Sequence, residues 1–186
     1  MRKWEAQVEQ AVEELAASHE ELSIVAHSMG TLFAIEQAVK REKITALFLL
    51  AVPMKLRLKL SMVRSTLKVY FGRIGTDMWA QAAKESCSIT LCKNPLRYLG
   101  WIPRFLELFG KIRRPRKLLP HLKTPAVAFQ SQKDEMVALS SLAYLQKNAS
   151  VDARVLAKSG HYYYEETDRA TLTEAFFVWI KEKGSR

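Results

Sequence analysis

One stretch, LSIVAHSMGTLFAIEQAVK at residues 22–40, constrains the fold of this chain more than any other. A short apolar run ends at Ala26, a sharp turn carries Ser28 at its tip, and an apolar helical pattern follows. Small residues, Ala26 and Gly30, stand two positions before and after the serine, where a tight turn leaves little room. A strand, turn and helix in this order push the serine hydroxyl clear of the sheet, near free N–H groups of the helix. The pattern therefore predicts a nucleophilic serine, and the alternative is a serine that only caps a helix.

Two later segments add to this turn. In chain order the three are VAHSMG at residues 25–30, TPAVAFQSQKDEMV at residues 124–137 and KSGH at residues 158–161. Together they resemble the α/β-hydrolases, and within these the small carboxylesterases and monoacylglycerol lipases, in the family's order of nucleophile, acid and histidine. The resemblance implies that Ser28 is the nucleophile, Asp134 the acid and His161 the base. It also implies that the backbone N–H of Met29 belongs to the oxyanion hole.

Each of these residues has a rival interpretation. Asp134 has the neighbouring Glu135 as a rival, but the family places its acid three residues before a valine, and Val137 selects Asp134. His161 alone would be read as a surface histidine, but it follows Ser-Gly after a strand and precedes a closing helix. The resemblance departs from the family at Ala26, which stands where the family has its first glycine.

The second oxyanion donor of the family comes from a loop after an earlier strand, usually marked by His-Gly. This sequence has no such segment, and only 27 residues precede Ser28. We therefore expect an N-terminally shortened version of the fold, in which the strand at residues 22–26 lies at an edge. We also expect a weakened oxyanion hole, because only the Met29 N–H is identified.

The remaining elements predict an α/β fold with a mostly parallel sheet of about four strands, flanked by helices. Apolar runs predict further strands at residues 44–51, 126–130 and 153–157. A last helix begins at Thr167 or Asp168, with an inward face formed by Leu172, Phe176, Trp179 and Ile180. We assign residues 1–53 and 117–186 to the hydrolase core and residues 54–116 to a helical cap insertion.

The pattern of residues 4–17 predicts a first helix with one apolar face and with acidic residues elsewhere on its surface. Apolar residues at spacings of four, four and three share one face, which we expect to point inward: Trp4, Val8, Val12 and Leu15. The acidic residues lie elsewhere on the helix, where we expect them to be solvated: Glu5, Glu9, Glu13 and Glu14.

The predicted cap carries the positive charge of the chain. Residues 54–116 contain fourteen Lys and Arg against three Asp and Glu, a net charge of +11, whereas the remainder carries −1. Such a surface suits nucleic acid, anionic lipid or acidic substrates, and the alternative is an ordinary solvated surface. By resemblance, a cap supplies an acyl channel, and the candidates for its lining, each with ordinary packing as the favoured alternative, are Met54, Met62, Phe71, Trp79, Leu99, Trp101, Phe105 and Phe109.

Composition excludes several classes of protein. No apolar run approaches the ~18–20 residues that span a bilayer, and the N-terminus lacks the apolar core of a signal peptide. Cys87 and Cys92 form no disulfide framework, and no two histidines share a metal-ligand spacing, so we expect neither a metal nor a cofactor. These features favour a reduced, cytoplasmic protein.

The leading hypothesis is a serine hydrolase that cleaves carboxylic esters through an acyl-serine intermediate. By resemblance, short to medium acyl esters or monoacylglycerols are the expected small-molecule substrates. The alternatives are a thioesterase or acyltransferase with the same triad, and a non-catalytic hydrolase remnant that binds a ligand. Expected partners are an anionic membrane surface, contacted through the cap, and a second copy of the chain; nucleic acid is not expected.

Overall fold

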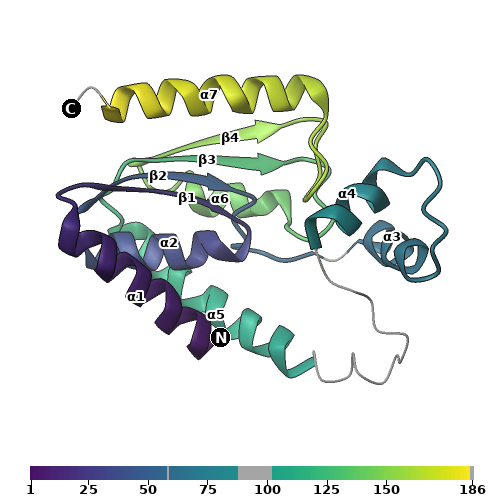
Figure 1. Cartoon of the computed structure of the whole chain (residues 1–186), viewed down its shortest axis with the longest axis horizontal. Coiled ribbons are helices and arrows are strands. Elements are labelled where there is room, and N and C mark those ends of the chain that lie inside the picture. The colour runs from purple at the N-terminus through teal and green to yellow at the C-terminus, as the bar shows by residue number, and fades with distance from the viewer. Residues whose placement is uncertain (58, 88–101, 185–186) are drawn as a thin grey trace.

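A computed structural model describes residues 1–57, 59–87 and 102–184 (Figure 1). The first half contains α1 (Arg2–Ser18), β1 (Leu22–His27), α2 (Met29–Lys40), β2 (Ile44–Leu50), α3 (Leu60–Tyr70) and α4 (Met78–Cys87). The second half contains α5 (Ile102–Leu118), β3 (Ala126–Ser131), α6 (Leu142–Leu145), β4 (Val151–Leu156) and α7 (Glu166–Gly184), with short 3-10 helices at Leu119–His121 and Leu139–Ser141. None of the described helices combines the length and the apolar character that crossing a membrane requires.

The described strands form one parallel sheet in the order β1-β2-β3-β4, which confirms the predicted fold class. Helix α7 covers one face of this sheet, while α1, α2, α5 and α6 lie on the other (Figure 1). All four strands run in the same direction, so their carboxyl ends meet at one end of the sheet, toward α3 and α4. Open α/β sheets place their ligand sites at this end.

The sheet is buried between two apolar layers. On the α7 side, Trp179 and Phe176 pack against Phe48 and Phe129, with Phe48 5.5 Å from Trp179 and 5.6 Å from Phe129 between ring centroids. On the other side, α2 and α5 bury a larger set of aliphatic residues against the strands. A strand covered on both faces reads as a continuous apolar run, which is why β2 stood out in the sequence.

Most element boundaries agree with the sequence to within two residues. The last strand, β4, begins at Val151 rather than at Ala153. In α7, Trp179 faces inward as predicted, but Ile180 is 44% exposed and is not part of the buried face. The helix after β3 is shorter than expected, since α6 covers only Leu142–Leu145.

Helix α1 lies in a different orientation from the one that its apolar spacing predicts. Trp4 and Leu15 are about half exposed, and only Val12 is buried. Successive helical residues are about 100° apart, which places Glu5, Glu9 and Glu13 in one row, the glutamate stripe. Val8 and Val12 lie between this stripe and the edge formed by Trp4 and Leu15. The helix is rotated so that the glutamate stripe, predicted to be solvated, faces α2 and α5.

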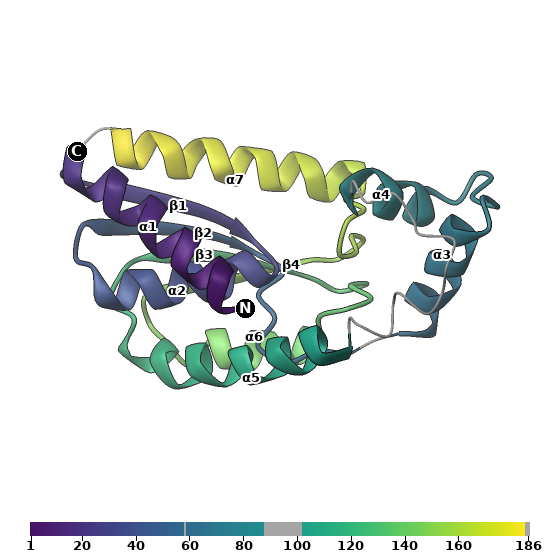
Figure 2. The ribbon, with the colours of Figure 1, turned by 60° about the horizontal axis from the view of Figure 1, so that its bottom comes forward.

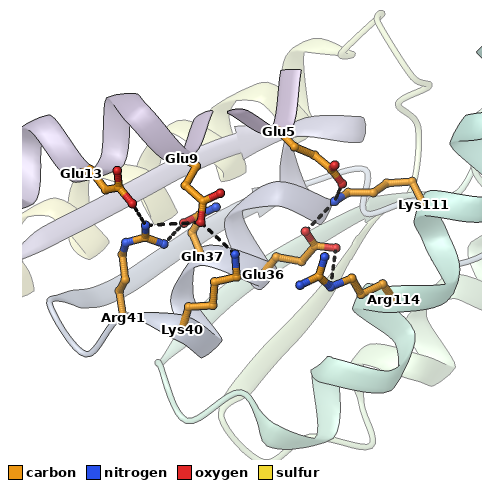
Figure 3. A network of polar contacts seen from close by, with 9 residues as sticks. All are labelled: Glu5, Glu9, Glu13, Glu36, Gln37, Lys40, Arg41, Lys111 and Arg114. Atoms are coloured by element: carbon orange, nitrogen blue, oxygen red, sulfur yellow. Dashed lines mark hydrogen bonds and ion pairs between the residues drawn. The ribbon is translucent and has the colours of Figure 1, made fainter. Parts of the chain in front are cut away.

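This rotation joins three helices by a network of ion pairs (Figure 3). At one end, the buried Lys111 of α5 contacts Glu36 of α2 at 2.5 Å and also contacts Glu5 of α1. At the other end, two glutamates of α1 pair with cations at the end of α2: Glu9 with Lys40 at 3.0 Å and Glu13 with Arg41 at 2.8 Å. The acidic stripe of α1 therefore docks the helix.

Helix α5 begins inside the range predicted for the cap but packs against the core helix α2, where its residue Ile112 is 3% exposed. Met54, predicted to line a channel, is fully buried in the same core layer. Arg116 donates two hydrogen bonds to the Met54 carbonyl, so part of the basic charge of this range is structural.

The extent of a cap stays a prediction. Cys92, Leu99 and Trp101 lie outside the described residues, as do the side chains of Met62, Cys87 and Phe105.

Strand β1 leads to a testable prediction, because β2 is its only neighbour in the described sheet. Its sequence LSIVAH has no proline or lysine, and Val25 is 53% exposed. Such an edge recruits another strand, whereas β4, at the opposite edge, carries Asp152 and Arg154. We therefore expect light scattering to give a mass above the 21.3 kDa monomer.

Val25→Lys should return the chain to the monomer mass, because a lysine blunts an edge strand. Val155→Lys, at the half-exposed matched position on β4, should leave the larger mass unchanged. A monodisperse wild-type monomer would contradict the prediction.

Candidate functional site

Ser28 lies at the turn between β1 and α2, as the sequence predicts. Its backbone has φ 52° and ψ −124°, in the left-handed half of the map that residues with a side chain rarely adopt. The turn is held on both sides, since Ser28 N–H donates to Leu50 of β2 at 2.8 Å and Thr31 Oγ1 donates to the Ser28 carbonyl at 2.6 Å. A Cβ added at Gly30 would lie 3.8 Å from the Ala26 Cβ, an ordinary contact, so the turn accommodates alanine at position 26.

Asp134 and His161 form a buried pair at the carboxyl ends of β3 and β4. His161 Nδ1 lies 2.8 Å from Asp134 Oδ2, and each side chain is 1% exposed. The second oxygen of Asp134 accepts hydrogen bonds from the backbone of Met136 at 2.8 Å and Val137 at 2.7 Å. These bonds fix the carboxylate so that it presents one oxygen to the imidazole.

Two further side chains hold His161, and the sequence alone did not assign them this role. Glu135, the rival acid, accepts a hydrogen bond from the His161 backbone N–H at 2.9 Å, whereas the ring nitrogen Nδ1 pairs with Asp134. His27 Nε2 lies 3.1 Å from the His161 carbonyl, and the two rings are 4.9 Å apart between centroids. Burial lowers the pKa of His27, and the nearby His161 lowers it further. Because a carbonyl oxygen only accepts, His27 Nε2 is the donor of this hydrogen bond.

The loop before His161 is fastened to the start of α7. Asp168 accepts hydrogen bonds from Lys158 N–H and Ser159 Oγ, each at 2.7 Å. Burial raises the pKa of Asp168, but these hydrogen bonds outweigh it and leave the pKa below its usual value. Tyr164 is partly buried near the site, and this burial together with the charge of Asp134 raises its pKa to about 12. The Ser-Gly-His signal thus marks a loop clamped at several points.

Ser28 and His161 lie on adjacent loops, because His27 directly precedes the serine and touches the histidine. His161 Nε2, the ring nitrogen that faces away from Asp134, is buried and has no hydrogen-bond partner among the described residues. Ser28 Oγ is therefore not hydrogen-bonded to it here. Such contacts are often long in ligand-free sites and tighten only with substrate. A buried nitrogen with an unused hydrogen-bonding position is suited to accept a proton from a group brought toward it.

Helix α4 contacts the histidine loop through one aromatic side chain. Trp79 packs over Gly160, and a Cβ added to this glycine would lie 1.8 Å from the Trp79 ring. The same indole lies 5.1 Å from the Tyr163 ring between centroids. Trp79, predicted to line a channel, therefore covers the backbone next to His161. The small residue before the histidine is needed because only a glycine leaves room for the indole.

Gly160→Ala should consequently lower the free energy of unfolding by about 1–3 kcal/mol, as is typical for forced overpacking. Urea unfolding measures this, with Gly110→Ala as the matched control. Gly110 lies in α5 with nothing within 4 Å of an added Cβ, so that alanine should stabilise the chain by about 0.5–1 kcal/mol.

If the clash is the cause, Gly160→Ala added to Trp79→Ala should cost little more than Trp79→Ala alone. A full cost in the Trp79→Ala background would show that the indole is not the reason for the glycine.

No cluster of three or more His, Cys, Asp or Glu side chains suited to a metal occurs in the described part of the chain.

No sequence family and no curated protein matches the chain. Solved structures do match. One is from work on LipS and LipT, two metagenome-derived lipolytic enzymes (TM-score 0.61, 14% identity, 96% of this chain and 72% of that one). Another is the monoacylglycerol lipase of Paleococcus ferrophilus (TM-score 0.59, 16% identity, 96% and 74%).

A third match is the thioesterase domain of the curacin biosynthetic pathway (TM-score 0.55, 17% identity, 91% of this chain and 70% of that one). These likenesses extend over nearly the whole of this chain. The strand order, the turn at Ser28 and the matches to these structures agree with one another: this chain has the α/β-hydrolase fold, with a sheet shortened to four parallel strands in its described part.

Proposed function

We propose that this protein is a serine hydrolase that cleaves carboxylic esters through an acyl-serine intermediate. The observation that carries the proposal is the buried His161–Asp134 pair at the carboxyl ends of β3 and β4, beside the strained turn of Ser28. A serine hydroxyl needs a base to become nucleophilic and a third group to orient that base. The chain supplies a candidate for each role at one end of the sheet.

In the proposed reaction, Ser28 Oγ attacks the ester carbonyl carbon and its proton passes to His161 Nε2. The carbonyl oxygen becomes an anion, which the Met29 N–H at the start of α2 stabilises together with the positive end of the helix dipole. The tetrahedral intermediate collapses, the alkoxide leaves with the proton from His161, and an acyl-serine remains. Water then attacks the acyl group by the same route, with His161 as base, and releases the acid and Ser28.

Asp134 has two tasks in this reaction. Its Oδ2 holds the proton on His161 Nδ1, which leaves Nε2 as the nitrogen that accepts the serine proton. Its negative charge stabilises the imidazolium that forms.

The substrates that we propose are short to medium acyl esters and monoacylglycerols, as in the lipolytic enzyme and the monoacylglycerol lipase that share the fold. Thioester cleavage is a second candidate, favoured by the thioesterase domain among the matching structures. The proposed groups act on the acyl carbonyl in either case, so hydrolysis rates of p-nitrophenyl esters and acyl thioesters of the same chain length distinguish the two.

A fluorophosphonate probe tests the proposal directly, because it forms a covalent bond only with an activated serine and releases fluoride. We expect labelling of the wild-type chain at Ser28, mapped by peptide mass spectrometry, and no labelling of Ser28→Ala. Ser23→Ala, which removes an exposed serine of β1, should be labelled like the wild type. An unlabelled wild-type chain would instead support the hydrolase remnant that binds without catalysis, and a label on another serine would remove Ser28 from the proposed reaction.

A further inference from the structure

Helix α3 exposes an apolar stripe. Three large apolar side chains of the helix and one at its C-cap follow the spacing of one helical face and are 49–77% exposed: Leu60, Val63, Leu67 and the C-cap residue Phe71. At about 100° per residue they fall within an arc of about 80°. The opposite face, with Ser65 and Val69, is the partly buried one. A water-soluble surface rarely keeps such a contiguous apolar row without a partner.

Positive charge surrounds this stripe. Residues 54–76 contain six cations and no acid: Lys55, Arg57, Lys59, Arg64, Lys68 and Arg73. Arg64 and Lys68 lie beside the apolar arc on α3, and Lys68 also pairs with Asp77 at 2.5 Å. A helix with an apolar face and flanking cations is the type that lies in the interface of an anionic bilayer. Nucleic acid would use the cations but would gain nothing from the leucines.

The position of α3 in the fold agrees with docking. Both views show α3 at the end of the molecule beyond the carboxyl ends of the strands, with α4 beside it (Figures 1 and 2). Asp77 connects the two helices, because it pairs with Lys68 of α3 and accepts hydrogen bonds from Trp79 and Ala80 at the start of α4. A surface that binds α3 would therefore lie at the end of the molecule that carries Ser28 and His161.

We infer that the outer face of α3 docks on an anionic lipid surface, with Leu60, Val63, Leu67 and Phe71 in the acyl boundary and the flanking cations on the headgroups. The apolar row gives the orientation and the cations give the preference for anionic lipid. This docking is independent of the proposed hydrolysis, since none of these residues belongs to the triad.

Co-sedimentation with vesicles tests the docking. We expect the chain to bind mixed phosphatidylglycerol–phosphatidylcholine vesicles at low salt, and to bind pure phosphatidylcholine much more weakly. Arg57→Gln, Arg64→Gln and Arg73→Gln together should weaken binding about 100-fold, since each cation near an anionic surface contributes about fivefold. Leu60→Ser with Leu67→Ser should weaken it about tenfold or more, and the residual binding should become steeply salt-dependent.

Matched controls come from α7. Phe177→Ser with Ile180→Ser removes two comparably exposed apolar residues, and Arg169→Gln removes one cation of α7; both should leave vesicle binding unchanged. All of the substituted side chains are exposed, so circular dichroism should show native folding throughout.

Three outcomes would overturn the inference. The first is wild-type binding by the leucine variant. The second is a leucine variant that changes the oligomeric mass and not vesicle affinity, which would make the stripe an interface between copies. The third is tighter binding to duplex DNA than to anionic vesicles. Fluorophosphonate labelling is scored separately, so failure of docking and failure of the proposed hydrolysis are distinguishable.

Discussion

Ser28→Ala should reduce hydrolysis of p-nitrophenyl acetate by about a thousandfold or more, while the chain stays folded. Removing the nucleophile of a Ser-His-Asp set leaves only substrate binding and oxyanion stabilisation, which accounts for losses of this size. The loss should appear in kcat, because Ser28 is proposed to bond with the substrate only as the reaction proceeds. Initial rates with the wild-type and variant chains at equal concentration measure it.

Ser28→Gly separates the chemistry from the fold. Its turnover should be as low as that of Ser28→Ala, but glycine adopts φ 52° without the steric cost that a Cβ imposes there. Glycine should therefore relieve about 1 kcal/mol or more of backbone strain. As a result, the glycine variant should unfold at a higher temperature than the alanine variant. Retained wild-type turnover in either variant would remove Ser28 from the proposed reaction.

Lys111→Met should be the most destabilising change outside the core, lowering the free energy of unfolding by about 3–5 kcal/mol. The reason is Glu36, whose side chain is 5% exposed and would lose the cation that contacts it at 2.5 Å. Arg114 lies 3.9 Å from the other oxygen of Glu36 but is itself 58% exposed, so it compensates weakly. A buried charge that loses its partner costs far more than the pair contributes.

The double variant Glu36→Leu with Lys111→Met should recover most of that loss, because an apolar pair of similar volume replaces a buried ion pair at little cost. Lys40→Met is the matched control. It breaks an ion pair with Glu9 in which both partners are about 40% exposed, and it should cost about 1 kcal/mol or less. Urea midpoints give all three values. Equal costs for Lys111→Met and Lys40→Met would contradict the argument from burial.

The sequence predicted well those features that depend on neighbouring residues. The turn at Ser28 needs only a strand, two small residues and a helix in succession, so its pattern is local. The apolar runs of β2 and β3 are also local, because a strand buried on both faces has no polar alternation. The preference for Asp134 over Glu135 has a physical counterpart in the Val137 N–H that fixes the aspartate carboxylate.

Features that depend on distant segments were missed or misread. The glutamates of α1 look solvated in the sequence because their partners, Lys40, Arg41 and Lys111, lie up to 106 residues away. Trp79 was a candidate channel residue with packing as the alternative, and its partner Gly160 could not be named because the contact depends on where α4 lies. The acceptor role of Glu135 likewise depends on a backbone N–H that follows a different strand.

The attachment of α1 makes this helix unusually sensitive to ionic strength. Val12 is its only buried residue, and most of its other anchors are ion pairs whose partners are partly solvated. Added salt weakens exposed ion pairs, the Debye length falling from about 10 Å at 0.1 M to about 3 Å at 1 M, and leaves apolar packing intact. Added salt should therefore release α1 while β2 and α2 stay protected, a difference that amide hydrogen exchange would resolve helix by helix. The segment that leads directly into β1 and the Ser28 turn would then respond to the ionic composition of its surroundings.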